Sequence, residues 1–188
     1  MQITIDKKTG TFLGIIAALI LAVVFLLAGN SSMPMNHSSH SSTMNSDELM
    51  FAQMMIPHHS QAVTMSELAL TNSTDPVIRE LATAIRDAQA PEIELMQGWL
   101  GSEGTSSSHM HDMEMGGMLT DAELEELASL KGSAFDQMFL VSMIAHHEGA
   151  LDMLSMIKDS DKAEVKKLYD NILSSQSAEI ETMKALLK

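Results

Sequence analysis

The sequence predicts an all-α protein: an antiparallel four-helix bundle, built from a duplicated helix pair, behind an N-terminal signal or transmembrane helix. Two repeated passages predict the duplication. Residues 51–65 read FAQMMIPHHSQAVTM and residues 139–153 read FLVSMIAHHEGALDM; residues 89–96 read QAPEIELM and residues 176–183 read QSAEIETM. Apolar residues in them recur every three or four positions, as on one face of a helix. Two helix pairs with short internal connections favour an antiparallel bundle.

Residues 1–29 are expected to hold a signal anchor or transmembrane helix. Residues 12–28 read FLGIIAALILAVVFLLA, an uninterrupted apolar stretch preceded by Lys7 and Lys8. Its length is at the short end for a membrane span, and its end lacks a good small-x-small cleavage site. The lysines place the N-terminus in the cytoplasm. We therefore expect a single pass through the cytoplasmic membrane, with the C-terminal domain outside, periplasmic or extracellular. The alternative is a cleaved signal peptide, which would release that domain.

Residues 30–45 read NSSMPMNHSSHSSTMN, a Ser-rich run that predicts a flexible tether. Residues 46–188 are then expected to form the bundle, with a Met- and His-rich loop at residues 101–119. In the first helix pair, Asn45 or Ser46 can cap a helix that runs to about Leu70, and the interior Pro57 is expected to bend it. Asp75 followed by Pro76 predicts the start of a second helix.

The second helix is expected to reach Leu100, before Gly101. In the second half, Thr120 and Glu123 form a capping-box pattern that predicts a short helix ending near residues 131–132. Ser133 is expected to cap the next helix, which runs to about Ile157. A final helix is expected over residues 161–187. The chain thus predicts four principal helices and one short one.

Adjacent histidines in each repeat suggest a metal site. Each His-His pair has a Met three residues before it and another six residues after it, so imidazole and thioether groups lie within about a turn or two of each other. That ligand set suits a soft or borderline metal, copper above all. Because neighbours on a helix point about 100° apart, one histidine of each pair should face the bundle centre and the other its flank. The candidate ligands are Met55, His58, His59, Met65, Met143, His146, His147 and Met153.

The partner helix of each repeat adds polar and thioether groups on one face. Gln89, Glu92 and Met96 recur as Gln176, Glu179 and Met183. A core-facing glutamate is costly unless it is paired or binds a metal. Two roles stay open: Glu92 and Glu179 bind the metal, or they accept hydrogen bonds from the histidines and so orient them.

The polar segments carry soft ligands that no core demands. The loop contains His109, Met110, His111, Met113, Met115 and Met118, and the tether contains His37 and His40 among further methionines. The chain has 18 Met but no Cys, so thiolate zinc and iron–sulfur sites are excluded. The loop and tether therefore predict metal capture. Imidazole binding should weaken below about pH 6, whereas thioether binding should persist.

Composition excludes several other functions. The net charge of −14 makes nucleic acid an unsuitable partner. The Glu-x-x-His pattern of di-iron bundles and the His-Glu-x-x-His pattern of zinc proteases are both absent from the sequence. We expect no enzyme, although a copper oxidase stays open.

The paired motifs MIPHHSQAVTM with QAPEIELM, and MIAHHEGALDM with QSAEIETM, resemble the ferritin-like four-helix-bundle family called domain of unknown function 305. The resemblance covers about residues 47–188. Some members of that family are periplasmic copper-binding proteins of the CopM type. It implies a ferritin-like bundle and, more loosely, copper binding and resistance, carried by the His-His pairs and their flanking methionines.

Together these observations predict an extracytoplasmic copper-binding protein that sequesters or transfers Cu(I), or Cu(II) at its histidines, in metal homeostasis or resistance. Expected partners are the metal ion, the membrane and a copper donor or acceptor protein. Two alternatives stay open: a non-catalytic envelope interaction or sensor module, and a His-based Zn or Ni binder.

Overall fold

The computed structural model describes residues 44–101 and 115–187, all within one compact unit that spans Ser42–Lys188. The predicted signal anchor at residues 1–29, the tether up to residue 43, and residues 102–114 of the predicted loop lie outside the described residues. Several predicted metal ligands therefore lie outside the described residues as well: His37, His40, His109, Met110, His111 and Met113. In the described ranges no helix combines the length and apolar character needed to cross a membrane.

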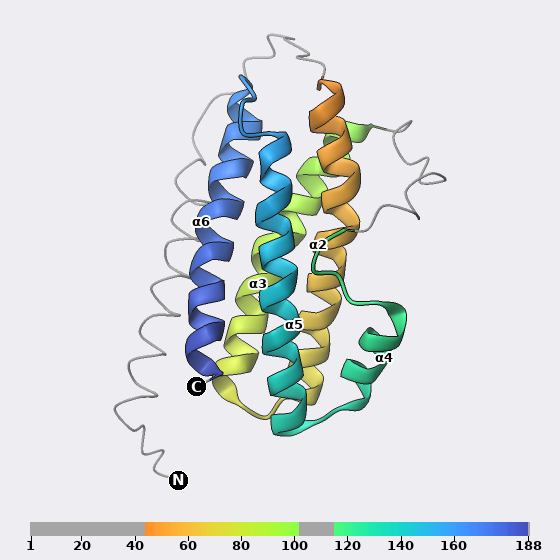
Figure 1. Ribbon diagram of the computed structural model, residues 1–188, viewed down its shortest axis with the longest axis vertical. Helices are drawn as coiled ribbons and strands as arrows, with labels where there is room; N and C mark the ends of the chain where they lie inside the picture. The colour runs from red at the N-terminus through yellow and green to blue at the C-terminus, as the bar shows by residue number, and fades with distance from the viewer. Residues whose placement is uncertain (1–43, 102–114, 188) are drawn as a thin grey trace. The chain divides into compact units, whose positions relative to one another are not determined.

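The described residues form helices and no strands, which confirms the all-α prediction. Figure 1 shows the long helices side by side, and the two helices of each pair run in opposite directions. The helices are α2 (Ser46–Asn72), α3 (Pro76–Leu100), the short α4 (Asp121–Ser129), α5 (Gly132–Met153) and α6 (Ala163–Leu186). Helix α2 packs against α3, α5 packs against α6, and α2 and α5 join the two pairs.

Three helix starts follow the predicted caps. The Asn45 side chain accepts hydrogen bonds from the amides of Asp47 and Glu48, while the Glu48 carboxylate accepts one from the Asn45 amide. The Asp75 side chain accepts from the Val77 amide, and Thr120 and Glu123 form the predicted capping box. These bonds satisfy amides that a helix terminus would otherwise leave without partners.

Other boundaries differ from the prediction. Helix α5 begins at Gly132, whose φ of +58° favours glycine, and its N-cap is Lys131 rather than Ser133. It ends at Met153 and continues as a 3-10 turn, η2 (Leu154–Met156), instead of running to Ile157 as one helix. Helix α6 begins at Ala163, two residues later than predicted. Helix α2 continues through Pro57 as a single helix.

The core consists of two apolar clusters separated by buried histidines. Along α2, Met55 belongs to one cluster and Met65 to the other, with His58 and His59 between them. Along α5 the order is reversed: Met143 shares the cluster of Met65, and the cluster that holds Met55 also takes up the end of α5. Equivalent residues of the two helix pairs therefore lie in opposite clusters: Met55 is in one cluster, and its repeat counterpart Met143 is in the other.

Candidate metal centre

Four histidines lie at the middle of the bundle, and none has any exposed surface. His58 on α2 and His146 on α5 face each other, with ring centroids 3.7 Å apart and ring planes tilted by 37°. The predicted division of each pair is confirmed: His58 and His146 meet between the two helix pairs, whereas His59 and His147 turn toward the partner helix of their own pair.

Each outward-turned histidine contacts a glutamate. His59 Nε2 lies 2.9 Å from Glu92 Oε2 on α3, and His147 Nε2 lies 2.7 Å from Glu179 Oε2 on α6. These are equivalent positions of the repeat. The carboxylates are 14% and 10% exposed, so each contact is largely shielded from water. A carboxylate that accepts from an imidazole N–H is the usual way to orient a metal-binding histidine.

The hydrogen bonds determine which ring nitrogens are free. A carbonyl can only accept, so His58 Nε2 donates to the Gly116 carbonyl oxygen at 3.2 Å. The carboxylate oxygens of Glu92 and Glu179 likewise accept from His59 and His147. Within the described residues, Nδ1 of all four histidines and Nε2 of His146 have no hydrogen-bond partner. In the neutral forms of His58, His59 and His147, a proton on Nε2 leaves Nδ1 unprotonated.

Burial keeps the facing pair neutral. Burial, together with the neighbouring His59 and His147, lowers the pKa of His58 to about 4, although the Gly116 hydrogen bond opposes this shift. Burial and the surrounding histidines also lower the pKa of His146. These two rings therefore gain a proton only at a lower pH than a free imidazole does, and the weakening of metal binding below about pH 6 stays a prediction.

Buried methionines flank the histidines on both sides. Met55 and Met96 have no exposed surface, and Met153 is 8% exposed; all three belong to one apolar cluster. Their repeat counterparts, Met143, Met183 and Met65, belong to the other cluster and are completely buried. Each cluster therefore contains three thioethers, which come from three different helices.

Further polar atoms near this layer are unpaired. Gln89, one turn before Glu92, is 2% exposed, and neither end of its amide has a hydrogen-bond partner among the described residues. The oxygen of its counterpart Gln176 is unpaired as well. Buried polar atoms without partners cost about 1–3 kcal/mol each. In the same described ranges, no group of three or more His, Asp or Glu side chains is placed to hold a metal ion.

Sequence reasoning missed the segment that covers the histidines, residues 115–119. Met115 and Met118, predicted as loop ligands, lie partly buried here. Gly117 has φ +79°, and a Cβ atom on it would lie 2.0 Å from the Ala145 carbonyl oxygen. A Cβ on Gly149 would lie 1.8 Å from the Gly116 carbonyl oxygen. The adjacent glycines 116–117 were the available signal, because such pairs mark close backbone approach.

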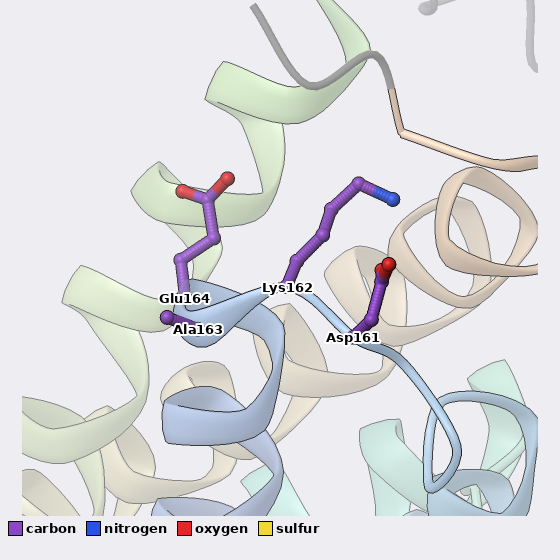
Figure 2. A pocket seen from close by; sticks show the side chains of 4 residues that line it. All are labelled: Asp161, Lys162, Ala163 and Glu164. Atoms are coloured by element: carbon purple, nitrogen blue, oxygen red, sulfur yellow. The ribbon is translucent and has the colours of Figure 1, made fainter. Parts of the chain in front are cut away.

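A second missed feature joins the start of α2 to the start of α6. Glu48, only 1% exposed, accepts hydrogen bonds from Lys162 Nζ and Ser160 Oγ, each at 2.6 Å. Lys162 also lines a surface hollow with Asp161, Ala163 and Glu164 (Figure 2). Glu179 lies 16 residues further along α6 than Ala163, roughly 24 Å at 1.5 Å per residue. The hollow is therefore remote from the histidines.

Comparison with known proteins places the chain in a family. Residues 48–187 match the model of the family described as Domain of unknown function (DUF305). A DUF305 fragment from Deinococcus radiodurans superposes with a TM-score of 0.65 at 32% identity, covering 76% of this chain and 96% of that one. A DUF305 protein of Streptomyces coelicolor, named as a predicted secreted protein, gives 0.66 at 33% identity, covering 76% and 92%.

CopM was solved in metal-bound forms. The Cu(I)-bound form gives a TM-score of 0.59 at 34% identity over 76% of this chain and 96% of that chain. CopM was also solved with Cu(II) and with Ag. Uncharacterized protein L153 of Acanthamoeba polyphaga mimivirus is 43% identical over 54 residues, which span 29% of this chain and only 36% of that protein. The family match covers most of the chain, which therefore belongs to the DUF305 family.

Proposed function

We propose that this protein binds copper, with Cu(I) favoured, and sequesters or transfers it outside the cytoplasm. The observation that carries the proposal is the set of free nitrogens in the bundle: four buried imidazoles present an unpartnered Nδ1, and three of them are oriented through Nε2 by an oxygen acceptor. Imidazoles oriented in this way are typical of metal ligands.

The chemistry of the donors favours a monovalent soft ion. Neutral imidazole and thioether groups suit Cu(I), whereas Zn and Cu(II) accept imidazole but gain little from thioethers. A buried cation also needs opposite charge nearby. Glu92 and Glu179 supply one carboxylate beside each histidine pair, at 2.9 and 2.7 Å from the outward-turned ring. One charge per repeat balances one monovalent ion per repeat.

The residues proposed as ligands are therefore divided by role. His58, His59, His146 and His147 would bind through nitrogen, and the buried methionines of the adjoining clusters would supply sulfur. Glu92 and Glu179 are assigned to orientation and charge balance, since they already accept from His59 and His147. We also propose that the Met- and His-rich loop and the tether capture the ion before it reaches the bundle.

Binding by relatives supports the same metal. CopM was solved with Cu(I), Cu(II) and Ag, at about a third sequence identity to this chain. The location outside the cytoplasm rests on the N-terminal apolar stretch and on the secreted designation of the Streptomyces coelicolor relative. We propose a carrier or store of copper rather than an enzyme.

A competition titration tests the proposal. The full chain is titrated anaerobically with Cu(I) against a chromogenic chelator, alongside a variant with His58, His59, His146 and His147 changed to Ala. The matched control is Thr64→Ala, because Thr64 is exposed on α2 and its hydroxyl donates to the Ser60 carbonyl oxygen of the same helix. We expect tight binding by the wild type and control, and loss of the tight sites in the quadruple variant.

Two outcomes would overturn it. Unchanged Cu(I) binding by the quadruple variant, with its helical circular dichroism intact, would remove the histidines from the site. Equal affinity for Zn(II) or Ni(II), lost in the same variant, would favour a general His-based binder instead.

A further inference from the structure

The covering segment, residues 115–119, is present once on a bundle that repeats itself. It contacts equivalent positions of the two repeats: Gln61 follows His58 by three residues on α2, and Gly149 follows His146 by three residues on α5. On α2 the Gln61 side chain makes the contact, whereas on α5 the backbone of Gly149 makes it. The segment thus breaks the equivalence of the two histidine pairs.

The contacts hold this segment closely. Gln61 Nε2 donates to the Leu119 carbonyl oxygen at 2.8 Å, and the Leu119 amide donates to Gln61 Oε1 at 2.7 Å. On the other side, the glycines of the segment lie directly on α5, with no room for a Cβ atom at Gly117 or Gly149. The Gly116 carbonyl is therefore fixed from both helices.

Its position matters for one ring only. Gly116 accepts from His58 Nε2, which leaves Nδ1 of the neutral His58 ring unprotonated. His146, in the equivalent place, has no acceptor for either nitrogen among the described residues. An acceptor on the far nitrogen fixes the tautomer and strengthens the ligand, and its loss costs 10- to 100-fold in metal affinity.

We propose that residues 115–119 are a positioning element that holds His58 in the Nε2–H tautomer and makes it a stronger ligand for a monovalent soft ion than His146, its equivalent in the other repeat. The inference rests on the proposed function. It adds that equivalent histidines of the two repeats contribute unequally to binding, and that Gln61 and Gly149 control the difference.

The test has a binding arm. The full chain is titrated calorimetrically with Ag+, the redox-inert stand-in for Cu(I). We expect His58→Ala to lower the Ag+ affinity more than His146→Ala does. Gln61→Ala should lower the Ag+ affinity about 10-fold or more while Thr64→Ala on the same helix leaves it unchanged. Gly149→Ala should act in the same direction, by displacing Gly116.

A second arm reads the ring itself without metal. Long-range 15N–1H correlation spectra distinguish a proton on Nε2 from one on Nδ1. We expect His58 to show the Nε2–H tautomer in the wild type and a mixture in Gln61→Ala, whereas His59, held by Glu92, is the same in both. A general loss of folded structure in Gln61→Ala would change the spectra of both histidines, not the tautomer of His58 alone.

The outcomes separate the two claims. Failure of the wild type to bind Ag+ or Cu(I) at all would overturn the proposed function and this inference with it. Equal losses of Ag+ affinity in His58→Ala and His146→Ala, or an unchanged His58 tautomer and Ag+ affinity in Gln61→Ala, would overturn the inference alone.

Discussion

His58 and His146 lie face to face across the contact between α2 and α5, with ring centroids 3.7 Å apart and no exposed surface on either. Two imidazolium ions at that distance would repel each other strongly, so the pair is compatible with the folded bundle when both rings are neutral. The contact lies between the two helix pairs and brings together equivalent residues of the repeat. It also leaves ring nitrogens without hydrogen-bond partners in the core.

The facing pair predicts how stability depends on pH. In the unfolded chain both rings bind a proton below about pH 6.5. In the folded chain His58 does so only near pH 4, and the pKa of His146 is also lowered. Stability should therefore be constant above pH 6.5 and fall below it, by about 1.4 kcal/mol per pH unit for each ring. Urea unfolding of the metal-free chain at pH 7, 6 and 5 measures this slope. A double variant, His58→Asn with His146→Asn, should have a shallower slope; an identical slope would contradict the account.

The glutamates of the site should matter for metal affinity. Glu92→Gln and Glu179→Gln remove the charge beside His59 and His147 but keep the shape of the side chain. We expect each to lower Cu(I) affinity 10- to 100-fold, because an orienting carboxylate is lost. The controls are Glu94→Gln and Glu181→Gln, which lie exposed two residues further along the same helices. If the control and site variants bind alike, the carboxylates have no such role.

Substitutions of the buried methionines distinguish a role as metal ligand from a role in core packing. Met96→Leu and Met183→Leu conserve volume at completely buried positions, so each should cost less than about 1.5 kcal/mol in stability. We expect Cu(I) affinity to fall while imidazole binding of Zn(II) stays unchanged, since only the soft ion gains from sulfur. Met50→Leu, at an exposed position, is the control. Unchanged Cu(I) affinity in both buried variants would leave these methionines as core residues alone.

Substitution of Glu48 should lower the stability of the fold without lowering copper binding. It is buried against Lys162 and Ser160. Burial raises its pKa, but hydrogen bonds from these two side chains and the Asn45 amide outweigh burial and lower it. Glu48→Ala leaves Lys162 without this partner and should destabilise the chain by about 3 kcal/mol. Chemical unfolding beside the exposed control Glu67→Ala checks the loss, and an unchanged copper stoichiometry checks that the ion pair is remote from the metal.

Much of the fold was predictable because its signals are local. Asn45, Asp75 and Thr120 cap the helices that the sequence predicts from them, since a cap needs only residues within a turn. The buried positions of α2 also follow from their spacing. Helix α5 begins at Gly132 rather than after Ser133, because a glycine at positive φ redirects the chain where no side chain caps it.

The candidate site was predictable in its histidines and glutamates but not in its surroundings. The repeat identified the four histidines and the glutamates that they contact. The covering segment depends on pairs 58 residues apart, such as His58 with Gly116 and Gln61 with Leu119, and the Glu48–Lys162 pair spans 114 residues. Such contacts arise only when helices pack, so no periodicity in the sequence reports them.

The most direct test of the metal centre is anomalous diffraction from crystals of the full chain loaded with Cu(I) under anaerobic conditions. The account predicts copper peaks inside the bundle, within bonding distance of Nδ1 atoms of the buried histidines, with Glu92 and Glu179 still bound to Nε2 of His59 and His147. Copper found only on the surface, with the four histidines in contact with protein alone, would contradict it.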